Sequence, residues 1–368
     1  MDYLLRIDRR VIFLLLFVAV TLAVLFGDPS KIPIVTTPAV RGVWEPIEKL
    51  KPGDPVLVAI DYDPASGAEL DPMAKASLRQ VFRKGVRMIS MTHWPTGVQM
   101  ASDLVAEMAM EFDDVTLETV KTFEAKVEAE KFLAEEIAKP GSGAGLSTGT
   151  RVTVNVGRKT GPASLPWTVD LLAAVRGAKP GLVEKPVSSD GGKTWAALRV
   201  IARAPTLEYG KDYCFLGTKG GEQVLVLTMG QSIPTAFPTD PHTGRSTRDL
   251  PVMQGVESLK DIAYLLELGA GSSVDWWVKY GSQRYGFKMG VGCTAVMAPD
   301  EYPYYGAGMI TGLCGGIKGA WEYEKLVETP GTAMKAIPAQ TVAHLLVIAL
   351  IVFCNIAYFW TRMRGVRP

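Results

Sequence analysis

Polar side chains follow several apolar runs of the sequence, at the points where buried strands would end. Asp61 and Asp63 stand two residues apart directly after the apolar run 56–60. Two carboxylates at this spacing can hold a divalent cation or act as a general acid and base. The alternative is that Asp61 caps a helix and that Asp63, which precedes Pro64, forms a turn.

Histidine and serine side chains add candidates at other strand ends. His93 follows a second apolar run and could serve as a general base near neutral pH, with a hydrogen-bonded rim histidine as the alternative. A long loop over residues 230–255 follows another run and contains further polar groups. Ligands bind beyond the carboxyl ends of strands in open α/β sheets. We therefore expect one ligand crevice lined by Asp61, Asp63, His93, Ser232, Asp240 and His242.

A cysteine nucleophile is a further chemical possibility, and the sequence disfavours it. Cys293 lies inside the apolar segment 288–296, whereas a nucleophile needs the sharp turn after a strand. The histidines are too far apart in sequence for a recognisable zinc motif, and no phosphate-binding or dinucleotide-binding glycine motif follows the first strand. The sequence therefore predicts no catalytic residue, no metal site and no cofactor.

Closely spaced glycines near the end of the same region suggest a contact surface. On a helix over residues 304–324 they would form a smooth groove where another backbone can approach. Each interior glycine costs a helix about 1 kcal/mol, so packing must compensate. The groove would contact either another chain or the domain's own sheet. The glycines are Gly308, Gly312, Gly315, Gly316 and Gly319.

The elements that position these residues alternate between strands and helices. Apolar runs predict strands at 56–60, 86–91, 151–156, 212–216, 223–229, 262–268 and 288–296. Helices are expected from residue 71 to 84, and at 98–112, 115–138, 167–175 and 274–285. This alternation predicts an α/β fold with a mainly parallel, doubly wound sheet. In pattern it resembles flavodoxin-like and class I glutamine amidotransferase domains.

Uncharged apolar segments at both ends of the chain predict transmembrane helices at 11–27 and 341–360. Arginines lie outside both segments, before the first and after the second. The positive-inside rule then places both termini in the cytoplasm and the region between the segments on the other side of the cell membrane. A cleaved signal peptide is the alternative for residues 1–27, although no small-residue cleavage site follows them.

These predictions divide the chain into seven parts. They are a cytoplasmic N-terminus (1–10), a transmembrane helix (11–27), a stalk (28–55), an extracytoplasmic α/β domain (56–327) with a helical or irregular insertion (115–205), a linker (328–340), a transmembrane helix (341–360) and a cytoplasmic tail (361–368).

Composition narrows the classes of partner. The 39 basic and 38 acidic residues give a net charge of +1, which excludes electrostatic capture of nucleic acid as a main activity. Cys214, Cys293 and Cys314 lie outside the membrane segments, and their odd number and wide spacing predict buried thiols, with one disulfide as the alternative.

The function expected from the sequence is that of a non-enzymatic scaffold in the lipid bilayer. The glycine segment would let it assemble as a homo-oligomer or with other membrane proteins. The alternative is a ligand-binding or sensory module that uses the crevice at the strand ends. A hydrolase or transferase is the third possibility.

Overall fold

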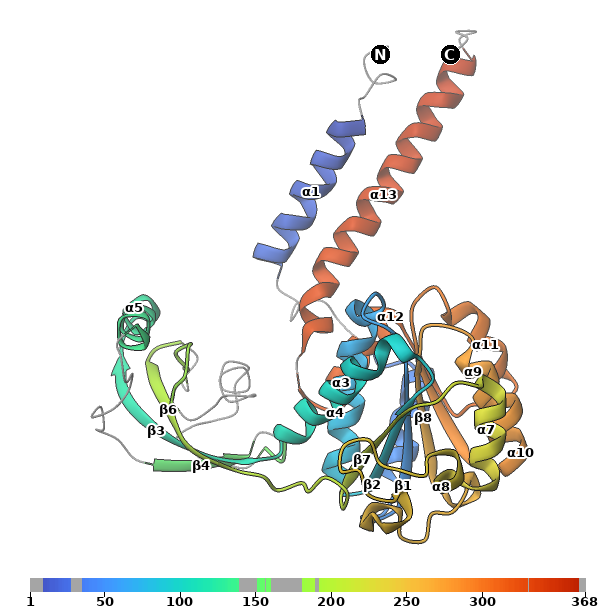
Figure 1. Cartoon of the computed structure of the whole chain (residues 1–368). Coiled ribbons are helices and arrows are strands. Elements are labelled where there is room, and N and C mark those ends of the chain that lie inside the picture. Colours follow the sequence, from blue (N-terminus) through green and yellow to red (C-terminus); the bar gives the residue numbers. More distant parts are fainter. Residues whose placement is uncertain are drawn as a thin grey trace.

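The computed structural model describes residues 9–27, 35–138, 151–155, 157–159, 181–188, 192–329 and 331–363. Within these ranges the chain forms an α/β domain, a small antiparallel sheet beside it, and two long helices that extend away from the domain side by side (Figure 1). The α/β architecture with a mainly parallel sheet is therefore confirmed.

The central sheet contains six strands, and every neighbouring pair is parallel. They are β1 (Pro55–Asp61), β2 (Arg87–Thr92), β7 (Tyr213–Thr218), β8 (Tyr264–Gly269), β9 (Lys288–Cys293) and β10 (Leu313–Gly315). Their spatial order is β10-β9-β8-β1-β2-β7. When the six strands are renumbered 1 to 6 in chain order and the sheet is read from β7, the order is 3-2-1-4-5-6. This is the strand order of doubly wound dinucleotide-binding folds and differs from the flavodoxin-like order. The chain order reverses between β1 and β8, so their carboxyl ends mark the switch point where such sheets bind ligands.

Helices cover both faces of this sheet. One face is covered by α2 (Pro38–Glu48), α3 (Gly67–Lys84), α4 (Val98–Met110) and α12 (Gly316–Leu326). The other is covered by α7 (Glu222–Gln231), α8 (Ile233–Ala236), α9 (Ser273–Trp276), a π-helical segment (Trp277–Ser282), α10 (Gln283–Tyr285) and α11 (Ala298–Gly306). Along β1, Val58 packs on the first face and Leu57 and Ala59 on the second. Burial on both faces explains why β1 is a continuous apolar run.

Short 3-10 helices complete the connections of the domain. They are Pro95–Gly97 before α4, and Thr247–Asp249, Pro251–Met253 and Leu259–Asp261 in the long loop before β8.

Part of the predicted stalk is folded into the domain. Residues 38–48 form α2, which begins after Thr37, whose side chain accepts a hydrogen bond from Val40 N. Pro38 occupies the first helical position, where its missing N–H costs nothing. Val43 and Ile47 are buried against the sheet, so this helix belongs to the core.

Two predicted elements differ from those in the structure, one in its type and the other in the residue at which it starts. Residues 223–229 form helix α7 rather than a strand, and the buried positions Leu225, Val226 and Met229 lie on one helical face. A short apolar run does not distinguish a strand from a buried helix. Helix α3 begins at Gly67, before Asp71, whose carboxylate accepts a hydrogen bond from Tyr62 instead of capping the helix.

The insertion forms a second sheet rather than a long helix. Its four strands are β3 (Asp114–Phe123), β4 (Arg151–Asn155), β5 (Gly181–Leu182) and β6 (Trp195–Ala204), in the order β4-β3-β6-β5. The predicted helix 115–138 is wrong in its first part, because β3 pairs antiparallel with β6 along its whole length. Helix α5 (Lys126–Ile137) forms only the second part. The predicted helix at 167–175 lies outside the described residues, whereas the predicted strand at 151–156 is present as β4.

The glycine segment is not one helix, so this prediction is wrong. Helix α11 ends at Gly306, strand β10 follows, and α12 starts at Gly316, which has a φ of +59°. Gly308 has a φ of +69°, outside the right-handed helical region. An added Cβ at Gly312 would lie 2.2 Å from Val43 N, and one at Gly319 would lie 2.9 Å from Cys314 C. Gly315 ends β10. Gly312 and Gly319 therefore permit close packing within the chain.

The last helix begins within the domain. Helix α13 (Thr332–Met363) includes most of the predicted linker, and Ala333 and Ile337 are buried in the domain core. The carboxylate of Glu324 accepts hydrogen bonds from the backbone N–H groups of Gly331, Ala333 and Met334 at 2.9–3.1 Å. It thereby satisfies donors that a helix start leaves unpaired.

Among the described residues, one helix is long and apolar enough to cross a membrane, over Thr332–Trp360. Helix α1 (Arg9–Phe26) has a shorter apolar stretch and packs against α13, where Gly27 lies beside Pro338. The two helices are antiparallel, so the start of α1 and the end of α13 lie at the same end of the pair (Figure 1).

Candidate functional site

The structure brings Asp61 and His93 into direct contact at the switch point of the sheet. Asp61 ends β1 and His93 follows β2, the neighbouring strand. Asp61 Oδ1 accepts the backbone N–H of His93 at 2.6 Å, and Oδ2 accepts Nδ1–H at 2.8 Å. Trp277 Nε1 donates to the same Oδ2 at 3.3 Å. Asp61 is fully buried and His93 is 8% exposed, so this pair belongs to the interior.

Two further buried polar residues, Glu267 on β8 and Ser273 at the start of α9, belong to the same region. Ser273 Oγ donates a hydrogen bond to Glu267 Oε1 at 2.6 Å. Burial, followed by the nearby Asp61 carboxylate, holds the pKa of Glu267 well above its ordinary value. The protonated form of Glu267 is therefore favoured beside the Asp61 carboxylate, because two adjacent carboxylates do not readily both ionise.

The Asp61–His93 pair has the orientation of a general base held by a carboxylate. His93 Nε2, the atom that would exchange a proton with a substrate, is buried and has no hydrogen-bond partner within the described part of the chain. The rings of Trp276 and Trp277 lie 5.4 Å from the imidazole, centroid to centroid. The cavities of about 510 and 460 Å³ in the α/β domain are lined by other residues. In this state the pair ties the ends of β1 and β2 together.

Two of the predicted crevice residues serve in a turn and a helix cap. Asp63 Oδ1 accepts a hydrogen bond from Ala65 N at 3.1 Å, as the turn alternative predicts. Ser232 precedes α8, where its Oγ accepts from Thr235 N and donates to Glu257. Neither side chain lies with Asp61 and His93, so the six residues do not form a single crevice.

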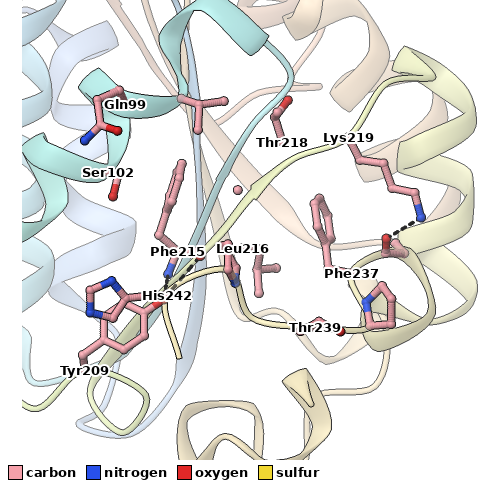
Figure 2. Close-up of a pocket in the computed structure, with 15 residues that line it drawn as sticks. Gln99, Ser102, Tyr209, Phe215, Leu216, Thr218, Lys219, Phe237, Thr239 and His242 are labelled. Atoms are coloured by element: carbon pink, nitrogen blue, oxygen red, sulfur yellow. Dashed lines mark hydrogen bonds between the residues drawn. The ribbon is translucent and has the colours of Figure 1, made fainter. Parts of the chain in front are cut away.

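An open cavity of about 510 Å³ lies beside the carboxyl-terminal part of the edge strand β7 (Figure 2). Its walls come from the end of β7 and the loop after it, the first turns of α4, and the segment 236–242. The volume lies within the range of small-molecule sites. Its polar lining residues are Gln99, Ser102, Tyr209, Thr218, Lys219, Thr239 and His242.

Asp240 supports this cavity from behind through Tyr209. Tyr209 donates its hydroxyl proton to Asp240 Oδ1 at 2.6 Å, and the buried Asp240 also accepts hydrogen bonds from Thr243. Burial and the Asp240 carboxylate raise the pKa of Tyr209, so the phenol stays neutral. The His242 ring contacts the Tyr209 ring in a tilted arrangement, with a centroid distance of 4.4 Å and an interplanar angle of 46°. Asp240 and His242 thus belong to the cavity, as support and lining respectively.

The loop that closes the cavity after β7 is not among the site residues predicted from the sequence. Gly217 and Gly221 have φ values of +84° and +115°, backbone conformations that favour glycine, and Thr218 and Lys219 stand between them. Lys219 Nζ donates to the carbonyl of Ala236 at 2.8 Å (Figure 2). The glycine spacing was the available signal. This signal is masked when residues 223–229 are interpreted as a strand, because the loop then reads as a connection between two strands and not as the start of helix α7.

The cysteines take no part in the site. Cys214, Cys293 and Cys314 are buried free thiols, as predicted. Burial raises the pKa of Cys293 to about 12, which leaves the thiol protonated and unreactive at neutral pH.

No protein-family model matches the chain, and no curated protein or solved structure matches it.

Proposed function

We propose that the chain is a membrane-anchored, non-enzymatic binding protein whose α/β domain takes up a small organic molecule in the cavity beside β7. The observation that carries this proposal is a 510 Å³ cavity at the carboxyl-terminal part of a parallel strand. Ligands of open α/β sheets bind outside the carboxyl ends of the strands, and the cavity lies at these ends, beside the edge strand two places from β1. Aromatic and polar side chains line it together, as in ligand pockets generally.

The anchor in this proposal is α13, with α1 packed beside it. Because α13 starts in the domain core and Glu324 fixes its first turn, the domain would stand in a set orientation to the membrane. The positive-inside rule supports cytoplasmic termini, and the antiparallel α1–α13 arrangement allows both to lie on one side. The domain would then sample ligands outside the cytoplasm.

A screen of the purified full chain in lipid nanodiscs against a library of small metabolites tests this function. Ser102→Trp is the matched variant, because the added indole fills the cavity from the first turns of α4. Ligands of the cavity should raise the unfolding temperature of the wild type and leave that of Ser102→Trp unchanged. Hits that stabilise both proteins equally, or an absence of hits, would contradict the proposal.

Assembly in the membrane remains a second proposal, although the glycine segment no longer supports it. The supporting observation is that the Glu324 carboxylate binds the start of α13 and so holds this helix to the domain. Contacts between the membrane helices of neighbouring chains would then orient their domains. Mass measurement of the complex extracted in mild detergent tests it. A monomer at all protein concentrations would contradict assembly with itself.

A further inference from the structure

We infer that the cavity beside β7 selects an organic anion, a molecule that joins a carboxylate or phosphate group to an apolar body. This inference rests on the proposed binding function and adds the chemical class of the ligand. Among the described residues, no aspartate or glutamate lines the cavity, whereas a lysine and a histidine, Lys219 and His242, both line it. Two carboxylates bind residues of the lining and are thereby engaged: Asp240 accepts hydrogen bonds from Tyr209 and Thr243, and Asp103 accepts one from Nε2 of Gln99 at 2.8 Å. The lining thus offers a cation without a competing acidic side chain.

Hydrogen-bond donors surround the cavity together with this cation. Thr218 Oγ1 is buried and has no partner within the described part of the chain, although Thr218 lines the cavity. Lys219 has three N–H donors, and the structure uses one of them on the carbonyl of Ala236. Ser102 Oγ adds a hydroxyl from the opposite wall (Figure 2). Donors of this kind form their strongest hydrogen bonds with ionised oxygens.

The backbone adds positive potential at the same place. The first turns of α4 form one wall, and neither a side-chain cap nor an acidic residue occupies the start of that helix. Helix N-termini carry partial positive charge and favour anions. The apolar body of the ligand would contact Phe215 and Phe237, which also line the cavity.

A second cavity shows that lysines in the lining do not by themselves indicate an anion-binding site. It has a volume of about 460 Å³, lies at the amino ends of β8 and β9, and is lined by Lys49, Lys260 and Lys288. Lys49 caps the carboxyl end of α2, and Lys288 follows the carboxyl end of α10. A cation at a helix carboxyl end neutralises the partial negative charge there, which explains Lys49 without a ligand. Lys288 lines this second cavity and not the one beside β7, so it is a suitable control position.

Three probes of the same ring and different charge test the inference: phenyl phosphate, benzamide and benzylammonium. Affinities are measured by calorimetry on the full chain in zwitterionic nanodiscs. Phenyl phosphate should bind about tenfold more tightly than the other two, the factor expected for one charge-assisted hydrogen bond. Lys219→Gln should remove this preference, Lys219→Arg should retain it, and Lys288→Gln should leave it unchanged.

The outcomes separate this inference from the binding function. Equal affinity for the three probes, or full phenyl phosphate affinity in Lys219→Gln, overturns the anion inference. So does the absence of phenyl phosphate binding up to about 10 mM, the range in which ligands of this size bind. The binding function fails only if no library member binds in a manner that Ser102→Trp prevents. Thermal unfolding of each variant confirms that it is folded.

Discussion

The carboxylate of Asp61 holds His93 by two hydrogen bonds, at 2.6 Å to its backbone N–H and at 2.8 Å to Nδ1 of its ring. This contact joins the carboxyl ends of adjacent strands at the switch point of the sheet. His93 also stands at the start of the segment that leads through residues 95–97 into α4, and the first turns of α4 line the cavity beside β7.

Asp61→Asn should lower the free energy of unfolding by about 2–4 kcal/mol, because an amide cannot accept all three donors that face the buried carboxylate. Chemical denaturation of the full chain measures the loss. Asp63→Asn is the control, since this carboxylate serves only a turn, and it should change the free energy by less than about 1 kcal/mol. Equal effects of the two substitutions would show that the Asp61 contacts do not stabilise the fold.

Stability should fall as pH rises through the pKa of Glu301. Burial raises this pKa to about 7 from an ordinary 4.5, and Glu301 Oε2 is buried without a partner in the described part of the chain. A carboxyl whose pKa is higher in the folded state stabilises the fold fully below its unfolded pKa and loses that contribution as pH rises through the folded pKa. The difference in unfolding free energy between Glu301→Gln and the wild type should therefore shift in favour of the variant from pH 5 to pH 8, by at most about 3 kcal/mol. An equal difference at both pH values would contradict this.

Glu324→Ala should loosen the joint between the domain and α13. The change leaves three backbone N–H groups at the start of the helix without their acceptor, which costs about 1–3 kcal/mol. Hydrogen exchange at Ala333 and Met334 should accelerate, as followed by mass spectrometry. Glu328→Ala removes an exposed carboxylate nearby and serves as the control. Unchanged protection in Glu324→Ala would mean that apolar packing alone holds the joint.

Gly312→Ala should destabilise the monomer and leave its assembly state unchanged. The added methyl group would meet backbone atoms of α2 at 2.2–2.4 Å, and such overpacking costs about 1–3 kcal/mol. Gly306→Ala is the matched control, because an added Cβ there has no neighbour within 4 Å. Thermal unfolding and complex mass are measured on both proteins. A change in mass without loss of stability would restore the interface hypothesis.

Topology can be tested with a reporter that is active only outside the cytoplasm. Because arginines lie outside both terminal apolar segments, the reporter should be active when fused near Gly141 and inactive after Pro368. The reverse pattern would place the α/β domain in the cytoplasm.

Local pattern alone was enough to find many of the elements. Strands β1, β2, β8 and β9 are apolar because they are buried, and that requirement is visible in a few consecutive residues. The positions of Asp61 and His93 at strand ends follow from the same runs. The apolar segments at the two ends of the chain were equally plain.

Relations between distant segments needed the tertiary structure. The strand order, and with it the separation of His242 from His93, depends on which buried surfaces pair, and periodicity carries no information on pairing. Glu267 was missed because it stands inside an apolar strand, where only its contacts with Ser273 and Asp61 identify it. Residues 223–229 became a helix and 115–123 a strand because long-range packing overrides weak local preference. The cavity likewise exists only where β7, α4 and a distant loop meet, since no one of these segments encloses a volume by itself.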